Sequence, residues 1–139
     1  MHALLPALIA GGDGRLVNIS SIGGRVAFPT YGAYAAAKFA LEGFSDVLRR
    51  EVGRLGVKVI VIEPGTIATP LWGKGLAIMD ELTATMTADQ RARYGDLVAT
   101  MRKQSAGQAG GGIPPTACGA GDRRGHPVAQ AAHTLPHRA

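Results

Sequence analysis

The hydrophobic positions along the chain predict short apolar strands that alternate with amphipathic helices. Residues 16–20 and 57–63 are nearly uninterrupted apolar runs, which is typical of parallel strands covered on both faces. Between them, residues 34–55 carry apolar side chains every three or four positions, which predicts one long helix. A strand, a helix and a strand in this order predict a right-handed βαβ unit, and therefore an α/β fold.

The helix expected over residues 34–55 has one apolar stripe and one polar face. The stripe is predicted to comprise Ala37, Leu41, Phe44, Leu48 and Leu55, with Ala40, Val47 and Val52 beside it. Arg49, Arg50 and Glu51 lie on or beside the opposite face, so we expect them to be solvated. Gly56 is expected to end the helix, because glycine readily adopts the left-handed conformation that follows a helix.

Further helices are expected on either side of this unit. Residues 1–10 read as the end of a helix, which the glycine-rich residues 11–14 stop. Residues 71–84 are moderately apolar, and residues 89–104 form a more polar helical pattern that Thr87 and Gln90 introduce as a capping pair. We therefore predict one domain over residues 1–104.

Residues 105–139 differ in composition from the rest of the chain. They are rich in Gly, Pro, His and Arg and hold few large apolar side chains, so we expect a disordered tail. We hypothesise that the part after about Pro115 is read in a shifted frame, which translation of the neighbouring frames tests. The glycines at 119, 121 and 125 lack the flanking strand of a nucleotide loop. Cys118 and the tail histidines match no common zinc spacing, so no metal site is predicted.

Composition and charge exclude several classes of protein. The 139 residues suit a single domain. The net charge is +5, but the basic residues are scattered rather than striped with aromatic residues, so nucleic-acid binding is not expected. The single cysteine fits a reducing compartment. The apolar run at residues 3–10 is too short to span a bilayer, and we expect a cytoplasmic protein.

The candidate chemistry lies at the start of the long helix and at the ends of the two strands. Tyr34 and Lys38 are four residues apart, so their side chains should share a helical face. A phenol beside an ammonium group is suited to general acid–base catalysis, because the cation favours the phenolate. Ser20 and Ser21 follow the first strand, and Pro64-Gly65 follows the second. Parallel sheets bind ligands at this edge. An ordinary polar turn explains the serines equally well, and a strand-ending turn is the weaker alternative for Pro64-Gly65.

Taken in order, strand–Ser, Tyr-x-x-x-Lys and strand–Pro-Gly-x-x-x-Thr resemble the short-chain dehydrogenase/reductase family from about Met1 to Trp72. Residues 33–50 are similar to members that act on retinol, steroids and related alcohols. The resemblance implies a partial Rossmann-type doubly wound fold, made of one βαβ unit with flanking helices. It also implies transfer of hydride between an alcohol or carbonyl substrate and NAD or NADP.

The same resemblance implies a role for each matching residue. Ser21 would hold the substrate oxygen, Tyr34 would exchange the proton, and Lys38 would bind the nicotinamide ribose. Pro64, Gly65, the backbone of Ile67 and Thr69 would contact the nicotinamide end of the cofactor. Phe28 would line the substrate side, and residues 71–84 would form a lid lined by Met79, Leu82 and Met86. Helices 1–10 and 34–55 would form a homodimer interface.

The chain also departs from the family pattern. The resemblance implies a preceding half-domain with the Gly-rich pyrophosphate loop, and a final apolar strand, and this sequence contains neither. Two hypotheses therefore stand. The chain is an NAD(P)-dependent oxidoreductase with a Ser-Tyr-Lys site, or it is a truncated, inactive remnant or dimerising module that does not bind cofactor alone. A cofactor fluorescence titration distinguishes them.

Overall fold

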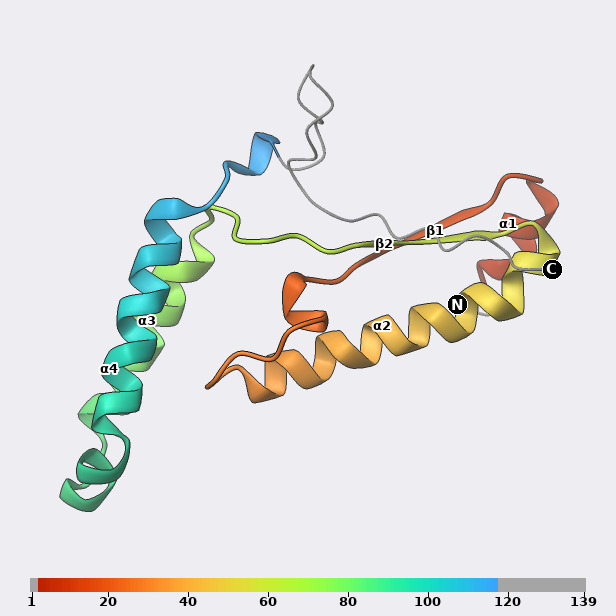
Figure 1. Cartoon of the computed structure of the whole chain (residues 1–139). Helices are drawn as coiled ribbons and strands as arrows, with labels where there is room; N and C mark the ends of the chain where they lie inside the picture. The colour runs from red at the N-terminus through yellow and green to blue at the C-terminus, as the bar shows by residue number, and fades with distance from the viewer. Residues whose placement is uncertain (1–2, 118–139) are drawn as a thin grey trace. The chain divides into compact units, whose positions relative to one another are not determined.

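A computed structural model describes residues 3–117 of the chain (Figure 1). These residues belong to two compact units, one ending at Gly65 and the other beginning at Thr66. The first unit contains helix α1 (Leu5–Ala10), strand β1 (Arg15–Ile19), a 3₁₀ helix η1 (Ile22–Gly24), helix α2 (Gly32–Val52), a 3₁₀ helix η2 (Gly53–Leu55) and strand β2 (Lys58–Ile62). The second contains helices α3 (Leu71–Ala84) and α4 (Ala88–Gly111) and a 3₁₀ helix η3 (Pro115–Ala117).

The first unit confirms the predicted strand–helix–strand arrangement. Strands β1 and β2 pair in parallel, with Leu16 opposite Val59 and Asn18 opposite Val61. Helix α2 runs alongside these strands (Figure 1). Its residues Leu48 and Val52 form the core together with Val57 and Val59. The fold is therefore α/β, with a two-stranded parallel sheet packed on a helix.

The expectation that both faces of the strands are covered was wrong. Val59 and Val61 are each only 1% exposed, whereas Val17 is 47% and Ile19 is 54% exposed. Successive side chains of a strand point to opposite faces, and α2 packs on the face that carries Val59 and Val61. Among residues 3–117, the face that carries Val17 and Ile19 is left accessible to solvent.

Helix α2 begins two residues before the predicted start and ends at Val52, three residues before the predicted end. It passes into η2, and Gly56 follows with a φ of 80°, which confirms its predicted role as the residue that ends the helical segment. The predicted apolar stripe needs correction: Ala37, Phe44 and Leu55 are exposed, and so are Ala40 and Val47 beside it. Leu48 and Val52 are buried as predicted, and the side of the helix turned to the sheet also buries two polar residues, Glu42 and Ser45.

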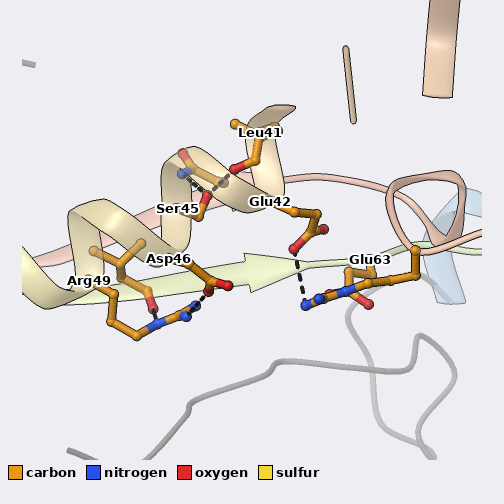
Figure 2. A network of polar contacts seen from close by, with 9 residues as sticks. Leu41, Glu42, Ser45, Asp46, Arg49 and Glu63 are labelled. Carbon is orange, nitrogen blue, oxygen red and sulfur yellow. Dashed lines mark hydrogen bonds and ion pairs between the residues drawn. The ribbon is translucent and has the colours of Figure 1, made fainter. Parts of the chain in front are cut away.

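Arg49 also differs from the expectation that it is solvated. Its side chain is only 15% exposed. Its Nε donates to the carbonyl oxygen of Val59 at 3.2 Å, and its guanidinium pairs with Asp46 (Figure 2). Arginine can lay its aliphatic stem along apolar surface while its charged end is paired. Arg49 therefore ties α2 to β2.

In the second unit, α3 and α4 pack against each other, and Arg102 of α4 pairs with Asp80 of α3. The predicted capping pair is confirmed: Thr87 and Gln90 each bond the backbone of the other. Helix α4 continues past the predicted end at Gln104 as far as Gly111, so the expectation of disorder was wrong for residues 105–111. Once a helix is nucleated, each added residue costs little, and Ser105 is buried.

After α4, Ile113 forms a short parallel bridge with Ile67, and residues 115–117 form η3, so they too are ordered. The remainder of the expected tail, residues 118–139, lies outside the described residues. Within residues 3–117, no helix is long and apolar enough to cross a membrane.

Candidate active site

The carboxyl ends of β1 and β2 meet at one edge of the sheet. The Ser20 amide donates to the Ile62 carbonyl at 2.7 Å, and the Ile22 amide donates to the Pro64 carbonyl at 3.1 Å. Ser21 caps η1, because its Oγ accepts a hydrogen bond from the Gly23 amide at 3.1 Å. Ser21 and Pro64 therefore lie at the same sheet edge, as the strand pattern predicted.

Tyr34 and Lys38 lie in the first turns of α2. The Lys38 Nζ lies 5.8 Å from the centroid of the Tyr34 ring and donates to the carbonyl of Ile19, the last residue of β1, at 3.0 Å. The side chain of Lys38 thus reaches back from the helix to the strand end. Tyr34 is 46% exposed, so its ring is accessible to a small molecule.

Gly23 connects the serine with the tyrosine. A Cβ atom added to Gly23 would lie 2.9 Å from Cε1 of Tyr34 and 3.5 Å from Oγ of Ser21. Both side chains therefore flank the same residue of η1. The structure brings Ser21, Tyr34 and Lys38 together around this point, and their catalytic roles stay predictions.

The residues predicted to contact the cofactor are divided between the two units. Pro64 and Gly65 end the described part of the first unit, and Gly65 is exposed. Ile67 and Thr69 belong to the second unit. The Ile67 carbonyl accepts a hydrogen bond from the Trp72 indole N–H at 2.8 Å, so part of its bonding capacity is already used.

The residues predicted to line the substrate side are mostly accessible. Phe28, in the loop between η1 and α2, is exposed, as is Leu82 on α3. Met79 and Met86 are partly buried. Tyr31, immediately before α2, meets the Tyr34 ring edge-on, with the ring centroids 6.3 Å apart.

Sequence analysis did not identify a network of one arginine and two glutamates beside this site. Arg25 Nη2 lies 2.9 Å from Oε1 of Glu63 and 3.2 Å from Oε2 of Glu42, and Figure 2 shows these two glutamates. Both glutamate side chains are buried. The hydrogen bond to Glu63 raises the pKa of Arg25. The sequence did contain a signal for this network, because Glu42 lies within the apolar pattern of residues 34–55 and Glu63 ends the apolar run 57–63. A carboxylate that is buried needs a charged or hydrogen-bonding partner.

A second polar contact in the core also escaped prediction. Asn18 of β1 donates through Nδ2 to Ser45 Oγ at 2.8 Å, and Ser45 donates to the Leu41 carbonyl at 2.6 Å. These bonds satisfy polar groups between the sheet and α2. Residues 3–117 contain no group of three or more His, Cys, Asp or Glu side chains placed to hold a metal ion. The Cys and His residues weighed as zinc ligands lie outside the described residues.

Comparison with known proteins places this arrangement in a family. The family described as short chain dehydrogenase matches residues 1–77, more than half of the chain. The uncharacterized oxidoreductase YbbO of Escherichia coli K12 is 53% identical over 66 residues, which cover 48% of this chain and 24% of that protein. The 17-beta-hydroxysteroid dehydrogenase type 6 of Bos taurus is 43% identical over 96 residues, covering 67% of this chain and 29% of that protein.

A solved structure of a short-chain dehydrogenase from Streptomyces avermitilis is 47% identical, with a TM-score of 0.46 over 50% of this chain and 26% of that one. The chain thus spans about a quarter of the length of these relatives. The family match covers both strands of the sheet and every residue of the Ser-Tyr-Lys cluster. The chain therefore belongs to the short-chain dehydrogenase family.

Proposed function

We propose that the chain provides the catalytic groups of an NAD(P)-dependent oxidoreductase that interconverts an alcohol and a carbonyl compound. The observation that supports this most directly is that Ser21 and Tyr34 flank Gly23 while Lys38 lies beside the Tyr34 ring. In this arrangement a hydroxyl, a phenol and an ammonium group can serve one reacting oxygen.

Each side chain then has a distinct task. The Ser21 hydroxyl binds the substrate oxygen and orients it, and the Tyr34 phenol donates or accepts the proton at that oxygen. The Lys38 ammonium stabilises negative charge on the phenol oxygen. An ammonium group has three donors, and only one of them is used by the Ile19 carbonyl. Among the described residues the other two donors are available to the hydroxyls of a bound ribose.

The residues fit the nicotinamide end of a cofactor and not its pyrophosphate end. A bound nicotinamide would accept or supply the hydride. Lys38 can bind the ribose, and Gly65 is exposed among the described residues, so its backbone can bond a carboxamide. The sequence has no Gly-rich strand–turn–helix segment, which is the element that normally holds the pyrophosphate.

We propose an apolar secondary alcohol or the corresponding ketone as the substrate. Ile22, Val26 and Phe28 expose apolar side chains in the segment that leads from Ser21 to α2. Apolar pocket walls with a few polar groups are typical of small-molecule sites. The similarity to a 17-beta-hydroxysteroid dehydrogenase is in line with such a substrate.

Replacing Tyr34 with Phe tests the proposed function. The variant lacks the proton-exchanging hydroxyl, so we expect NAD(P)H-dependent turnover to fall by at least about 100-fold while cofactor binding is kept. Tyr94→Phe on α4 removes a comparable hydroxyl from the second unit and should leave turnover unchanged. Because the chain spans only about a quarter of the length of its relatives, both changes should be made in this chain and at the matching positions of a full-length relative. Full turnover of the Tyr34→Phe variants would refute the assignment.

A second function is supported by the exposed apolar surfaces. Phe39, Phe44 and Val47 lie on the side of α2 turned away from the sheet, and each is about half exposed. On this alternative, the 139-residue chain taken alone is a dimerising module that binds no cofactor. It predicts no change in NADPH fluorescence at micromolar protein, and a dimer in sedimentation. A double variant, Phe44→Gln with Val47→Gln, should be monomeric, whereas micromolar cofactor binding would contradict the alternative.

A further inference from the structure

Arg25 connects three elements around the candidate active site. It directly follows η1, whose capping residue is Ser21. Its Nε and Nη2 donate to Glu63 Oε1 at 3.0 and 2.9 Å. Its Nη2 also lies 3.2 Å from Glu42 Oε2 on α2. One guanidinium group thus joins η1 to the end of β2 and to the helix that carries Tyr34.

The glycines of η1 show how closely this segment lies against α2. A Cβ on Gly24 would be 2.8 Å from Ser20 Oγ and 3.1 Å from Glu42 Cγ. A Cβ on Gly23 would be 2.9 Å from Tyr34 Cε1. Two consecutive residues of η1 therefore touch Tyr34 and Glu42, which lie about two turns apart on α2.

Hydrophobic packing does not explain this close approach. The glycines have no side chains to bury, and Ile22, the remaining residue of η1, is exposed. Within the described residues, Ser20 Oγ and Glu42 Oε1 are buried without a hydrogen-bond partner, which opposes the arrangement. The backbone hydrogen bond from Ile22 to Pro64 ties η1 to the end of β2, and the ion pair of Arg25 with Glu42 joins this segment to α2.

We propose that Arg25 is a positioning residue for the Ser-Tyr-Lys site. By bridging Glu42 and Glu63, it holds η1 against α2 and so fixes the Ser21 hydroxyl relative to the Tyr34 ring. The consequence for catalysis depends on the proposed function, but the placement of η1 is measurable without turnover. A planar guanidinium can bond two carboxylates in fixed directions, which an ammonium group cannot do.

The placement is tested by NMR on the full 139-residue chain. The diagnostic signal is the nuclear Overhauser effect between the Gly23 α protons and the Tyr34 ring protons. We expect this signal to be lost in Arg25→Met and weakened in Arg25→Lys. Signals between methyl groups of Leu48 and Val59, which belong to the core, should persist and show that the variants are folded.

Arg49→Met provides the matched control. Arg49 also pairs with a carboxylate on α2 and bonds β2, so its loss removes a comparable interaction at a distance from η1. We expect the Gly23–Tyr34 signal to survive in this variant. An undiminished signal in Arg25→Lys, or in a folded Arg25→Met, overturns the proposal. Equal loss of the signal in Arg49→Met overturns it too, because the effect would then reflect general destabilisation. If Arg25→Met does not fold, Arg25→Lys decides.

Turnover separates this inference from the proposed function. If the wild-type chain shows the Gly23–Tyr34 signal and the Arg25 variants lose it, but no variant reduces a ketone, then the positioning role holds and the proposed function fails for this chain. If the wild type is active, kcat of Arg25→Lys should fall by at least about 10-fold, because small misplacements of reacting groups are costly. The KM for NAD(P)H should change little. Unchanged kcat would overturn the catalytic role of Arg25.

Discussion

Gly23 shows how a single hydrogen atom in place of a methyl group sets the geometry of the site. Its open side faces the ring of Tyr34, at a distance that a Cβ atom could not tolerate. The ring is half exposed and can turn away, so Gly23→Ala should displace it rather than unfold the chain. We expect about 1 kcal/mol of destabilisation, at the low end for an added methyl group, and at least about a 10-fold loss of turnover.

The matched control for this prediction is Gly32→Ala. Within residues 3–117, a Cβ at Gly32, the first residue of α2, meets no atom of another segment within 4 Å. Alanine is the better helix former by about 1 kcal/mol, so this variant should keep its activity and be equally or more stable. Thermal unfolding and turnover of the two variants, compared side by side, provide the measurement. Equal activity in both would mean that Gly23 does not set the position of Tyr34.

Asp13 gives the chain a stability term that depends on pH. Its carboxylate accepts a hydrogen bond from Lys58 and pairs with Arg15, and these contacts lower the pKa of Asp13. A depressed carboxyl pKa stabilises the fold above the unfolded value of about 3.9 and loses that contribution as the pH falls through the folded value.

Asp13→Asn should therefore lower the midpoint of thermal unfolding at pH 7. The difference from the wild type should shrink steadily as the pH falls below about 4. Glu51→Gln, at an exposed position of α2, is the control and should show a smaller difference at pH 7. A gap between wild type and Asp13→Asn that persists at low pH would show that Asp13 acts by some means other than its charge.

At this scale, the sequence predicted the residues whose positions follow from local geometry. Tyr34 and Lys38 are related by helical spacing alone, and Ser21 by its place after a strand. The bridge from Arg25 to Glu42 and Glu63 could not be predicted, because it joins three elements that only the folded chain brings together. Hydrophobic periodicity predicts which face of an element a side chain lies on, but it does not predict which charged residue from a distant part of the sequence it will contact.

The helices show the same limit at the scale of elements. The extent of α2 followed from its pattern, but Phe44 and Val47 were assigned to the wrong face because Glu42 and Ser45 occupy part of the buried side. A stripe drawn from apolar residues alone cannot include buried polar residues. Likewise, the composition after Gln104 indicated disorder, whereas α4 extends to Gly111, because hydrogen bonding continues from a helix already formed.

The capping box at the start of α4 yields a prediction at this scale. Thr87 Oγ1 accepts a hydrogen bond from the Gln90 amide, and losing such a cap costs about 1 kcal/mol. Thr87→Ala should therefore reduce helical circular dichroism and lower the unfolding temperature. Thr100→Ala is the control: its hydroxyl bonds the Asp96 carbonyl within the same helix, and alanine is the better helix former. No difference between the two would show that the cap does not stabilise α4.

At the scale of the whole molecule, the sheet face that residues 3–117 leave accessible is the most prominent feature of the first unit. The exposed Val17 and Ile19 belong to a two-stranded sheet, and sheets this small are seldom stable alone. We expect the chain to bind hydrophobic dyes and to self-associate at high concentration. Val17→Thr with Ile19→Thr keeps the β-branched shape and should reduce both effects.

Dye fluorescence and sedimentation measure this prediction. Phe44→Gln with Val47→Gln, on the outer side of α2, serves as the comparison. If only the Phe44→Gln, Val47→Gln variant lowers dye binding, then the sheet face with Val17 and Ile19 is not the surface that binds the dye and self-associates.

The hydrogen bond from Lys38 to the last carbonyl of β1 affects how any lysine variant must be interpreted. The same amine that faces the phenol also fastens the start of α2 to the strand. Truncating this side chain therefore removes both the ammonium group that we propose acts in catalysis and the hydrogen bond to Ile19. Loss of activity in such a variant would combine the loss of the ammonium group with the loss of the hydrogen bond to Ile19. Only a longer cationic side chain that still reaches the Ile19 carbonyl can separate the catalytic effect from the structural one.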